Sequence, residues 1–120
     1  NLKEQDKVSW VKYAGLEDSE YKSLANKYCP NGAGAVFTFG VKGGFDAGVK
    51  LVNEVQLFSH LANIGDTKSL IIHPSSTTHS QLTDDEQIAA GAAKDVVRLS
   101  VGIEDSEDII GDLSQALHKV

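Results

Sequence analysis

Four short stretches of the chain have the alternation or the β-branched content that is typical of β-strands. They are residues 8–13, 35–41, 69–72 and 96–101. The stretch 35–41 is the richest in aromatic and β-branched residues, and its period of two puts Phe37 and Phe39 on one face. The pattern therefore predicts four strands, of which 35–41 carries the strongest signal.

Four other stretches repeat their apolar residues every three or four positions, which predicts amphipathic helices. They are residues 20–28, 45–55, 84–90 and a last helix that starts at Ser106 and ends at 118–119. Thr83 and Glu86 have the spacing of a capping box for the third of these helices. In the first helix the apolar side consists of Tyr21, Leu24, Ala25 and Tyr28.

Strands and helices alternate along the chain, an order compatible with both a parallel α/β unit and an α+β domain. The strands are few and their faces are mixed in polarity, which favours an α+β fold with a small sheet covered on one side. Residues 56–64 fit a short strand and an irregular loop equally well. No repeat, low-complexity tract or linker interrupts the chain, so we expect a single domain.

Arg98 lies in the strand 96–101 among residues that favour burial. Alternation puts Val97, Leu99 and Val101 on one face and Val96, Arg98 and Ser100 on the other. A guanidinium on a rigid strand can hold a carboxylate by two parallel hydrogen bonds, which makes Arg98 a candidate anchor for an amino acid or another carboxylic acid. Spacing alone favours the alternative, an arginine on the solvated face of an edge strand.

Composition narrows the classes of partner. The chain has 120 residues, 41% of them hydrophobic, and a net charge of −6, which argues against a nucleic-acid partner. The single cysteine, Cys29, excludes an internal disulfide and favours a reducing, cytoplasmic location. No apolar stretch approaches membrane-spanning length, so we expect no membrane partner. The chain begins at Asn1 and contains no methionine, which suggests a piece of a longer protein.

Three further groups of residues have weak resemblances to a metal site, a hydrolase site and a phosphate-binding turn. His73 and His79 match no zinc-ligand spacing, so we expect no metal site. Ser75 and Ser76 lie near His79 but lack the G-x-S-x-G motif of hydrolases, which favours a polar loop. Residues 40–44 are rich in glycine and lie between a strand and a helix, where backbone amides can bind phosphate. They have neither the G-x-G-x-x-G motif nor the Walker spacing, which favours a plain turn.

Two segments together resemble a known family. They are residues 61–80, LANIGDTKSLIIHPSSTTHS, and residues 98–104, RLSVGIE. In sequence, order and separation they resemble the C-terminal part of the Cys/Met-metabolism family of pyridoxal-phosphate (PLP) enzymes, and the likeness covers nearly the whole chain. It implies the small C-terminal domain of a fold-type I, aspartate-aminotransferase-like enzyme, with a mostly antiparallel sheet of about four strands and helices covering one face.

The resemblance assigns roles to three residues. In the family, the arginine of the R-L-S-V-G-x-E strand binds the α-carboxylate of the amino-acid substrate, and Arg98 matches it. Asn63, which spacing alone identifies only as a turn residue, matches a position that helps to hold this carboxylate. Thr78 matches a threonine near the substrate side chain in the lyases. No catalytic, cofactor-binding or metal-binding residue is expected within the chain.

Residues 62–70, ANIGDTKSL, look most like the O-acetylhomoserine sulfhydrylase branch of this family. Cystathionine γ-lyases tend to have a glutamate where this chain has Ala62. The resemblance implies a parent enzyme in which sulfide or a thiol replaces the acetate of O-acetyl-L-homoserine, giving homocysteine or methionine. The alternatives are cystathionine γ-synthase or methionine γ-lyase, and a catalytically silent module that binds a carboxylate or a protein partner.

The resemblance also implies that the chemistry is performed elsewhere in the parent protein. In the family the Schiff-base lysine and the phosphate-binding residues lie in a larger, preceding domain, and the dimer partner contributes to each site. The resemblance further implies that the parent is a homo-oligomer, a dimer of dimers. We therefore expect residues 1–120 to form a single substrate-carboxylate-binding domain, without the larger N-terminal domain that binds PLP. Such a chain is expected to be inactive alone.

Overall fold

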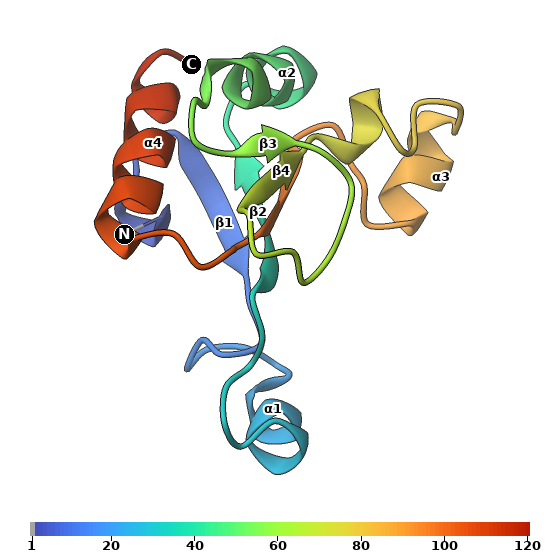
Figure 1. The fold of residues 1–120 in the computed structure, drawn as a ribbon. Helices are drawn as coiled ribbons and strands as arrows, with labels where there is room; N and C mark the ends of the chain where they lie inside the picture. Colours follow the sequence, from blue (N-terminus) through green and yellow to red (C-terminus); the bar gives the residue numbers. More distant parts are fainter. Residues whose placement is uncertain (1) are drawn as a thin grey trace.

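The computed structural model describes residues 2–120, which form a five-stranded sheet with its helices (Figure 1). The helical elements are η1 (Leu2–Glu4), α1 (Lys22–Tyr28), α2 (Gly44–Glu54), η2 (Pro74–Ser76), α3 (Asp84–Ala89) and α4 (Ser106–His118). The strands are β1 (Val8–Lys12), β2 (Val36–Val41), β3 (Ser59–His60), β4 (Leu70–Ile72) and β5 (Val96–Ser100). The strand order is β1-β2-β5-β4-β3, and only β3 and β4 pair in parallel.

This architecture confirms the expected α+β class and the mostly antiparallel sheet. The count of about four strands was one too low, because β3 is a two-residue strand within the stretch 56–64 that the sequence left undecided. The predicted helices and the other strands agree with the structure to within two residues at each end. The capping box is also confirmed, since the Thr83 hydroxyl accepts from the Glu86 N–H and the Glu86 carboxylate accepts from the Thr83 N–H.

One face of the sheet, here called the inner face, carries the hydrophobic core. The register places Phe37 and Phe39 of β2 opposite Leu99 and Val97 of β5, so these four side chains share the inner face. Helices α2 and α4 pack against it, and their apolar residues join the same buried cluster. These helical residues are Ala47, Leu51, Val52, Ile109, Leu113, Ala116 and Leu117. The expectation that helices cover one face is thus confirmed for the face that holds Phe39.

The edge-strand interpretation of Arg98 is wrong. Strand β5 is central, because it pairs with β2 on one side and with β4 on the other. Arg98 lies on the opposite face of the sheet, here called the outer face, together with Val96 and Ser100, which are 4% and 2% exposed. Alternation predicts which residues share a face, but it contains no information about how many neighbouring strands flank them, and this caused the error.

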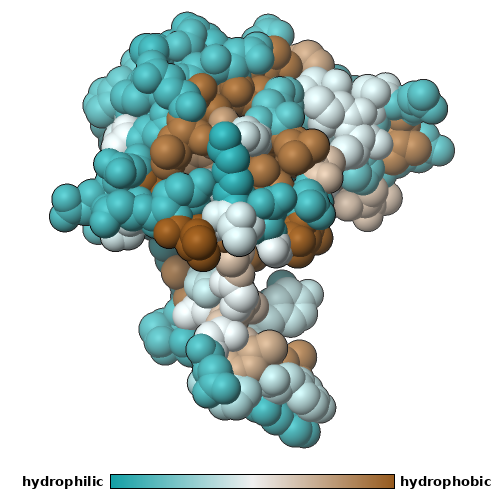
Figure 2. Space-filling model, viewed as in Figure 1, coloured by the Kyte–Doolittle hydropathy of each residue, from teal (hydrophilic) through white to brown (hydrophobic). Residues whose placement is uncertain are grey.

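Residues 13–35 form an arm that leaves the sheet after β1, carries α1 at its tip and returns at β2 (Figure 1). Helix α1 forms within two residues of its predicted bounds, but it buries none of its residues. The exposed fractions are 56% for Tyr21, 50% for Leu24 and 68% for Tyr28. Figure 2 shows hydrophobic atoms at the surface of both the arm and the main body. The two ends of the arm are joined by the Tyr13 hydroxyl, which donates to the Gly34 carbonyl over 2.9 Å.

Asp112 is a buried carboxylate that the apolar pattern of the last helix did not reveal. It accepts hydrogen bonds from three consecutive backbone N–H groups, those of Gln56 at 2.8 Å, Leu57 at 2.8 Å and Phe58 at 3.2 Å. The Gln115 side chain donates a fourth bond, over 3.0 Å. Hydrogen bonds to a carboxylate are stronger than those between neutral groups, so Asp112 fixes the connection from α2 to β3 against α4.

We expect Asp112→Ala to lower the free energy of unfolding of the chain by about 2–4 kcal/mol, because three backbone donors lose their acceptor. Asp112→Asn should cost less, since its amide oxygen still accepts. The measurement is urea denaturation at pH 7. Asp108→Ala, which removes an exposed carboxylate from the same helix, is the control and should cost less than about 1 kcal/mol. Equal stability losses for the Asp112 and Asp108 variants would contradict the anchoring role.

Candidate functional site

Arg98 lies on a row of four residues that the register aligns across the outer face of the sheet. In strand order these are Lys12, Thr38, Arg98 and Ile72. The Arg98 side chain is half-buried, and its Nη2 lies 3.5 Å from the backbone carbonyl oxygen of Asn63, a long hydrogen bond. Within residues 2–120, no carboxylate forms an ion pair with Arg98. Most of its five N–H donors are therefore available to a ligand.

Asn63 is exposed and lies in a loop, residues 61–69, that connects β3 to β4. The structure brings Asn63 to Arg98 as the sequence led us to expect, but the contact uses its main-chain carbonyl. The Asn63 side-chain oxygen accepts from the Ile64 N–H over 2.9 Å. Its side-chain NH2 group forms no hydrogen bond within residues 2–120, so it is free to donate to an acceptor beside Arg98.

A polar clamp, made of Ser69, Gly102 and Glu104, ties this loop to the chain that follows β5. One Glu104 oxygen accepts from the Ser69 N–H over 2.8 Å, and the other accepts from the Ser69 hydroxyl over 2.7 Å. The Ser69 hydroxyl in turn accepts from the Gly102 N–H over 2.9 Å. Nearby, the Gly65 N–H donates to the Ser100 hydroxyl over 3.3 Å. The loop is therefore fastened to the same segment that carries Arg98.

Gly102 is required by the close approach of the two chains at the clamp. A Cβ atom at this position would overlap the carbonyl group of Thr67 and lie 2.6 Å from a carboxylate oxygen of Glu104. The Thr67 carbonyl also accepts from the Ile103 N–H over 2.9 Å. Any larger residue would push the loop away from β5. Sequence reasoning did not assign Glu104 or Ser69, although the R-L-S-V-G-x-E motif contains Ser100, Gly102 and Glu104 and was the available signal.

Thr78 forms no hydrogen bond with the Arg98 site or with the clamp in the described part of the chain. It is exposed, in the segment between η2 and α3, and its hydroxyl lies 2.8 Å from Nδ1 of His79. It forms no hydrogen bond with Arg98 or Asn63 within residues 2–120. Its place near a substrate side chain is therefore still a prediction.

The residues considered above as possible metal, hydrolase or phosphate-binding sites have structural roles. Both ring nitrogens of the buried His73 have partners, Nε2 at 2.8 Å from the Lys94 carbonyl and Nδ1 at 2.9 Å from the Ser76 hydroxyl. The Ser75 hydroxyl donates to Gln87 over 2.7 Å. In the described part of the chain, no three His, Cys, Asp or Glu residues gather as potential metal ligands. Gly43 and Gly44 have φ values of 105° and 67°, which supports the turn interpretation of residues 40–44.

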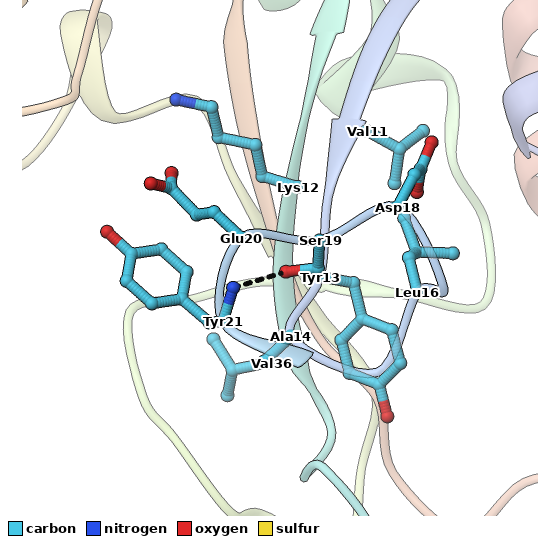
Figure 3. A pocket seen from close by; sticks show the side chains of 10 residues that line it. All are labelled: Val11, Lys12, Tyr13, Ala14, Leu16, Asp18, Ser19, Glu20, Tyr21 and Val36. Carbon is cyan, nitrogen blue, oxygen red and sulfur yellow. Dashed lines mark hydrogen bonds between the residues drawn. The ribbon is translucent and has the colours of Figure 1, made fainter. Parts of the chain in front are cut away.

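A hollow of about 380 Å³ lies where the arm meets the sheet (Figure 3). Its side chains come from the end of β1, the first half of the arm and the start of β2, and they include Lys12, Asp18 and Glu20. The Tyr21 N–H donates to the Ser19 hydroxyl at its rim over 3.2 Å. The lining does not include Arg98, Asn63 or Thr78, so the hollow is separate from the candidate carboxylate site.

Comparison with known proteins identifies the family of this chain. The model of the family described as "Cys/Met metabolism PLP-dependent enzyme" matches residues 1–118. The chain belongs to this family.

Three relatives are named as a homocysteine synthase, an O-acetyl-L-homoserine sulfhydrylase and an L-methionine gamma-lyase. Homocysteine synthase of Schizosaccharomyces pombe is 55% identical, over 97% of this chain and 27% of its own length. O-acetyl-L-homoserine sulfhydrylase 1 of Thermus thermophilus is 50% identical, over 97% of this chain and 28% of its own length. The chain thus spans a little over a quarter of these relatives. L-methionine gamma-lyase of Fusobacterium nucleatum is 45% identical over 99% of this chain and 30% of its own length.

A solved structure supports the fold assignment. The protein is described as an O-acetylhomoserine (thiol)-lyase of Campylobacter jejuni and carries a pyridoxyl group on a lysine. It matches 98% of this chain and 28% of its own, with 42% identity and a TM-score of 0.89. The expected domain type, that of a fold-type I PLP enzyme, is confirmed by this match. Among residues 2–120, no helix combines the length and apolar character needed to cross a membrane.

The residues present do not form a site for the cofactor of this family. PLP enzymes hold their cofactor through a lysine, which is typically activated by desolvation or by neighbouring groups. Within residues 2–120, nine of the ten lysines are exposed, and the half-buried Lys22 is bonded to the Gly15 carbonyl and paired with Glu17. The chain therefore offers a guanidinium for a carboxylate but no enclosed lysine for PLP.

The clamp lowers the pKa of Glu104 below its ordinary value of 4.5, mainly because the Ser69 N–H and then the Ser69 hydroxyl bond to the carboxylate. A lowered pKa in the folded state stabilises the fold fully above pH 4.5, and this contribution is lost as the pH falls through the folded-state pKa. We expect the stability advantage of the unmodified chain over Glu104→Gln to shrink between pH 6 and pH 3.

The measurement is urea denaturation of both chains across this pH range, with Glu107→Gln as a control that removes an exposed carboxylate nearby. A stability difference between the unmodified chain and Glu104→Gln that stays constant down to pH 3 would show that the clamp does not depend on the Glu104 charge.

Proposed function

We propose that residues 1–120 are the substrate-carboxylate-binding domain of a PLP-dependent O-acetyl-L-homoserine sulfhydrylase. The observation that carries this proposal is the half-buried guanidinium of Arg98, which has no carboxylate partner among residues 2–120. Partial burial of a charge is costly unless the charge is paired. The α-carboxylate of an amino acid would supply the partner through two parallel hydrogen bonds.

The reaction proposed for the parent enzyme is replacement of the acetate of O-acetyl-L-homoserine by sulfide or a thiol, giving homocysteine or methionine. The names of the relatives at 50–55% identity support this substrate class. The methionine γ-lyase relative at 45% identity makes that activity the main alternative within the family.

Each residue of the candidate site has a role in binding the substrate. Arg98 holds the carboxylate, and the free side-chain NH2 of Asn63 donates a further hydrogen bond to it. Thr78 is proposed to lie beside the substrate side chain. PLP, bound by the rest of the parent, supplies the electron sink for the reaction. The contribution of this chain is to fix the position of the amino acid relative to that cofactor.

The rest of the parent is proposed to be a larger, preceding PLP-binding domain in a cytoplasmic homo-oligomer, a dimer of dimers. Two features of the chain support a contact of this kind. The arm exposes Tyr21, Leu24 and Tyr28, and the outer face of the sheet presents Arg98, which has no carboxylate partner among residues 2–120. Apolar side chains exposed together on one segment are typical of surfaces that pack against another domain or chain.

In the full-length parent we expect Arg98→Lys to raise the KM for O-acetyl-L-homoserine about tenfold or more. A lysine keeps the charge but cannot form two parallel bonds to a carboxylate, and the loss of one charge-assisted bond costs about 1.5–3 kcal/mol. The measurement is steady-state kinetics with O-acetyl-L-homoserine as the varied substrate. Lys12→Arg, at an exposed position in the same row, is the control and should leave KM within about twofold. An unchanged KM in Arg98→Lys would refute the carboxylate role.

A second candidate function is a non-enzymatic module that binds a carboxylate by itself, and the unpaired Arg98 is the observation that favours it. Both functions require that the chain lack a cofactor lysine. When the isolated chain is titrated with PLP, we therefore expect no stoichiometric absorbance band of a lysine-bound cofactor. A band of one equivalent that is lost on replacing a single lysine would show that the chain holds PLP after all.

Calorimetric titration of the isolated chain with methionine separates the two functions. Binding at micromolar concentration that is lost in Arg98→Ala favours the module. Binding weaker than millimolar favours the enzyme domain, which needs the remainder of the parent to complete its site.

A further inference from the structure

We propose that Glu104 is a positioning residue for the substrate carboxylate, acting through Ser69 and the loop 61–69 to set Asn63 against Arg98. This role rests on the proposed function of Arg98 and adds to it a residue that does not touch the substrate. Glu104 is 35 residues distant from Ser69 in the sequence, and both of its carboxylate oxygens are used on that one partner.

Hydrogen bonds, more than apolar packing, hold the loop in place. Most of its residues are exposed, including Leu61 at 51% and Ile64 at 63%. Its attachments to the chain after Arg98 are polar, at Gly65, Thr67 and Ser69. A loop with few buried apolar side chains moves when its hydrogen bonds are removed. The clamp is therefore one of three polar restraints on the loop that carries Asn63, and it is the one that uses a charged group.

The clamp joins the loop that carries Asn63 to the strand that carries Arg98, at the point where the paired strands β4 and β5 meet. Ser69 is fully buried and directly precedes β4, while Gly102 and Glu104 follow β5, and these two strands are hydrogen-bonded neighbours. The loop leaves this point and places the Asn63 carbonyl 3.5 Å from the Arg98 guanidinium. That contact orients one edge of the guanidinium and leaves the remaining donors for a carboxylate.

The test uses the full-length parent enzyme with Glu104→Ala, Arg98→Ala and the double variant. We expect Glu104→Ala to raise the KM for O-acetyl-L-homoserine about tenfold while kcat changes less than about twofold, because only the grip on the carboxylate is loosened. The double variant should raise KM by less than the product of the two single effects, since Glu104 and Arg98 act on the same carboxylate contact. Glu104→Gln should raise KM less than Glu104→Ala, because its amide oxygen still accepts from the Ser69 N–H.

Two controls separate positioning from general stability. Glu107→Ala makes the same change in charge at an exposed position three residues away and should keep the KM of the unmodified enzyme. Thermal unfolding of each variant reports how much folded enzyme is present, and if Glu104→Ala does not fold, the comparison is made with Glu104→Gln.

The outcomes distinguish this inference from the proposed function. A raised KM in Arg98→Ala together with an unchanged KM in Glu104→Ala would overturn the positioning role and leave the proposed function standing. Effects on KM that multiply in the double variant, or a loss confined to kcat, would show a merely structural role and overturn it as well. An unchanged KM in Arg98→Ala would overturn the proposed function itself.

Discussion

The pairing of β5 with both β2 and β4 fixes the geometry on which the candidate site depends. One face of this five-residue strand contributes Val97 and Leu99 to the core, and the opposite face presents Arg98. A register slip by one residue would exchange the two faces and bury a guanidinium among apolar side chains, at a cost far above that of an ordinary substitution. The stability of the core thus also holds the Arg98 backbone in one position.

The loop 61–69 is positioned by a different kind of interaction. Apolar packing is non-directional, so it defines the register of β5 but sets the orientation of an exposed loop poorly. Hydrogen bonds are directional, and the Ser69, Gly102 and Glu104 clamp supplies them where β4 and the end of β5 meet. The domain therefore uses hydrophobic burial to place Arg98 and charge-assisted hydrogen bonds to fasten the loop that carries Asn63.

The distance in sequence between interacting residues explains what could be predicted from the sequence. The strands and helices were predictable because their patterns depend on neighbours along the chain, as at the Thr83 capping box. Strand order was not, which led to the edge-strand error at Arg98. Asp112 and Glu104 were also missed, because their backbone partners lie 54 to 56 and 35 residues away and leave no periodic signal. Asn63 was singled out by family resemblance, since its spacing indicates only a turn.

The distribution of charge bears on which ligands the proposed carboxylate site would attract. The chain has a net charge of −6, yet its only arginine has no acidic partner within residues 2–120. Several acidic groups are instead bonded to backbone donors, as at Asp112, or to lysines, as at Glu54. An anion that approaches such a domain is repelled over most of its surface and attracted where the guanidinium lies. A small zwitterion such as an amino acid, which has no net charge, escapes most of this repulsion and can still place its carboxylate on Arg98. The charge pattern therefore favours amino acids over dianionic competitors, as the proposed sulfhydrylase substrate requires.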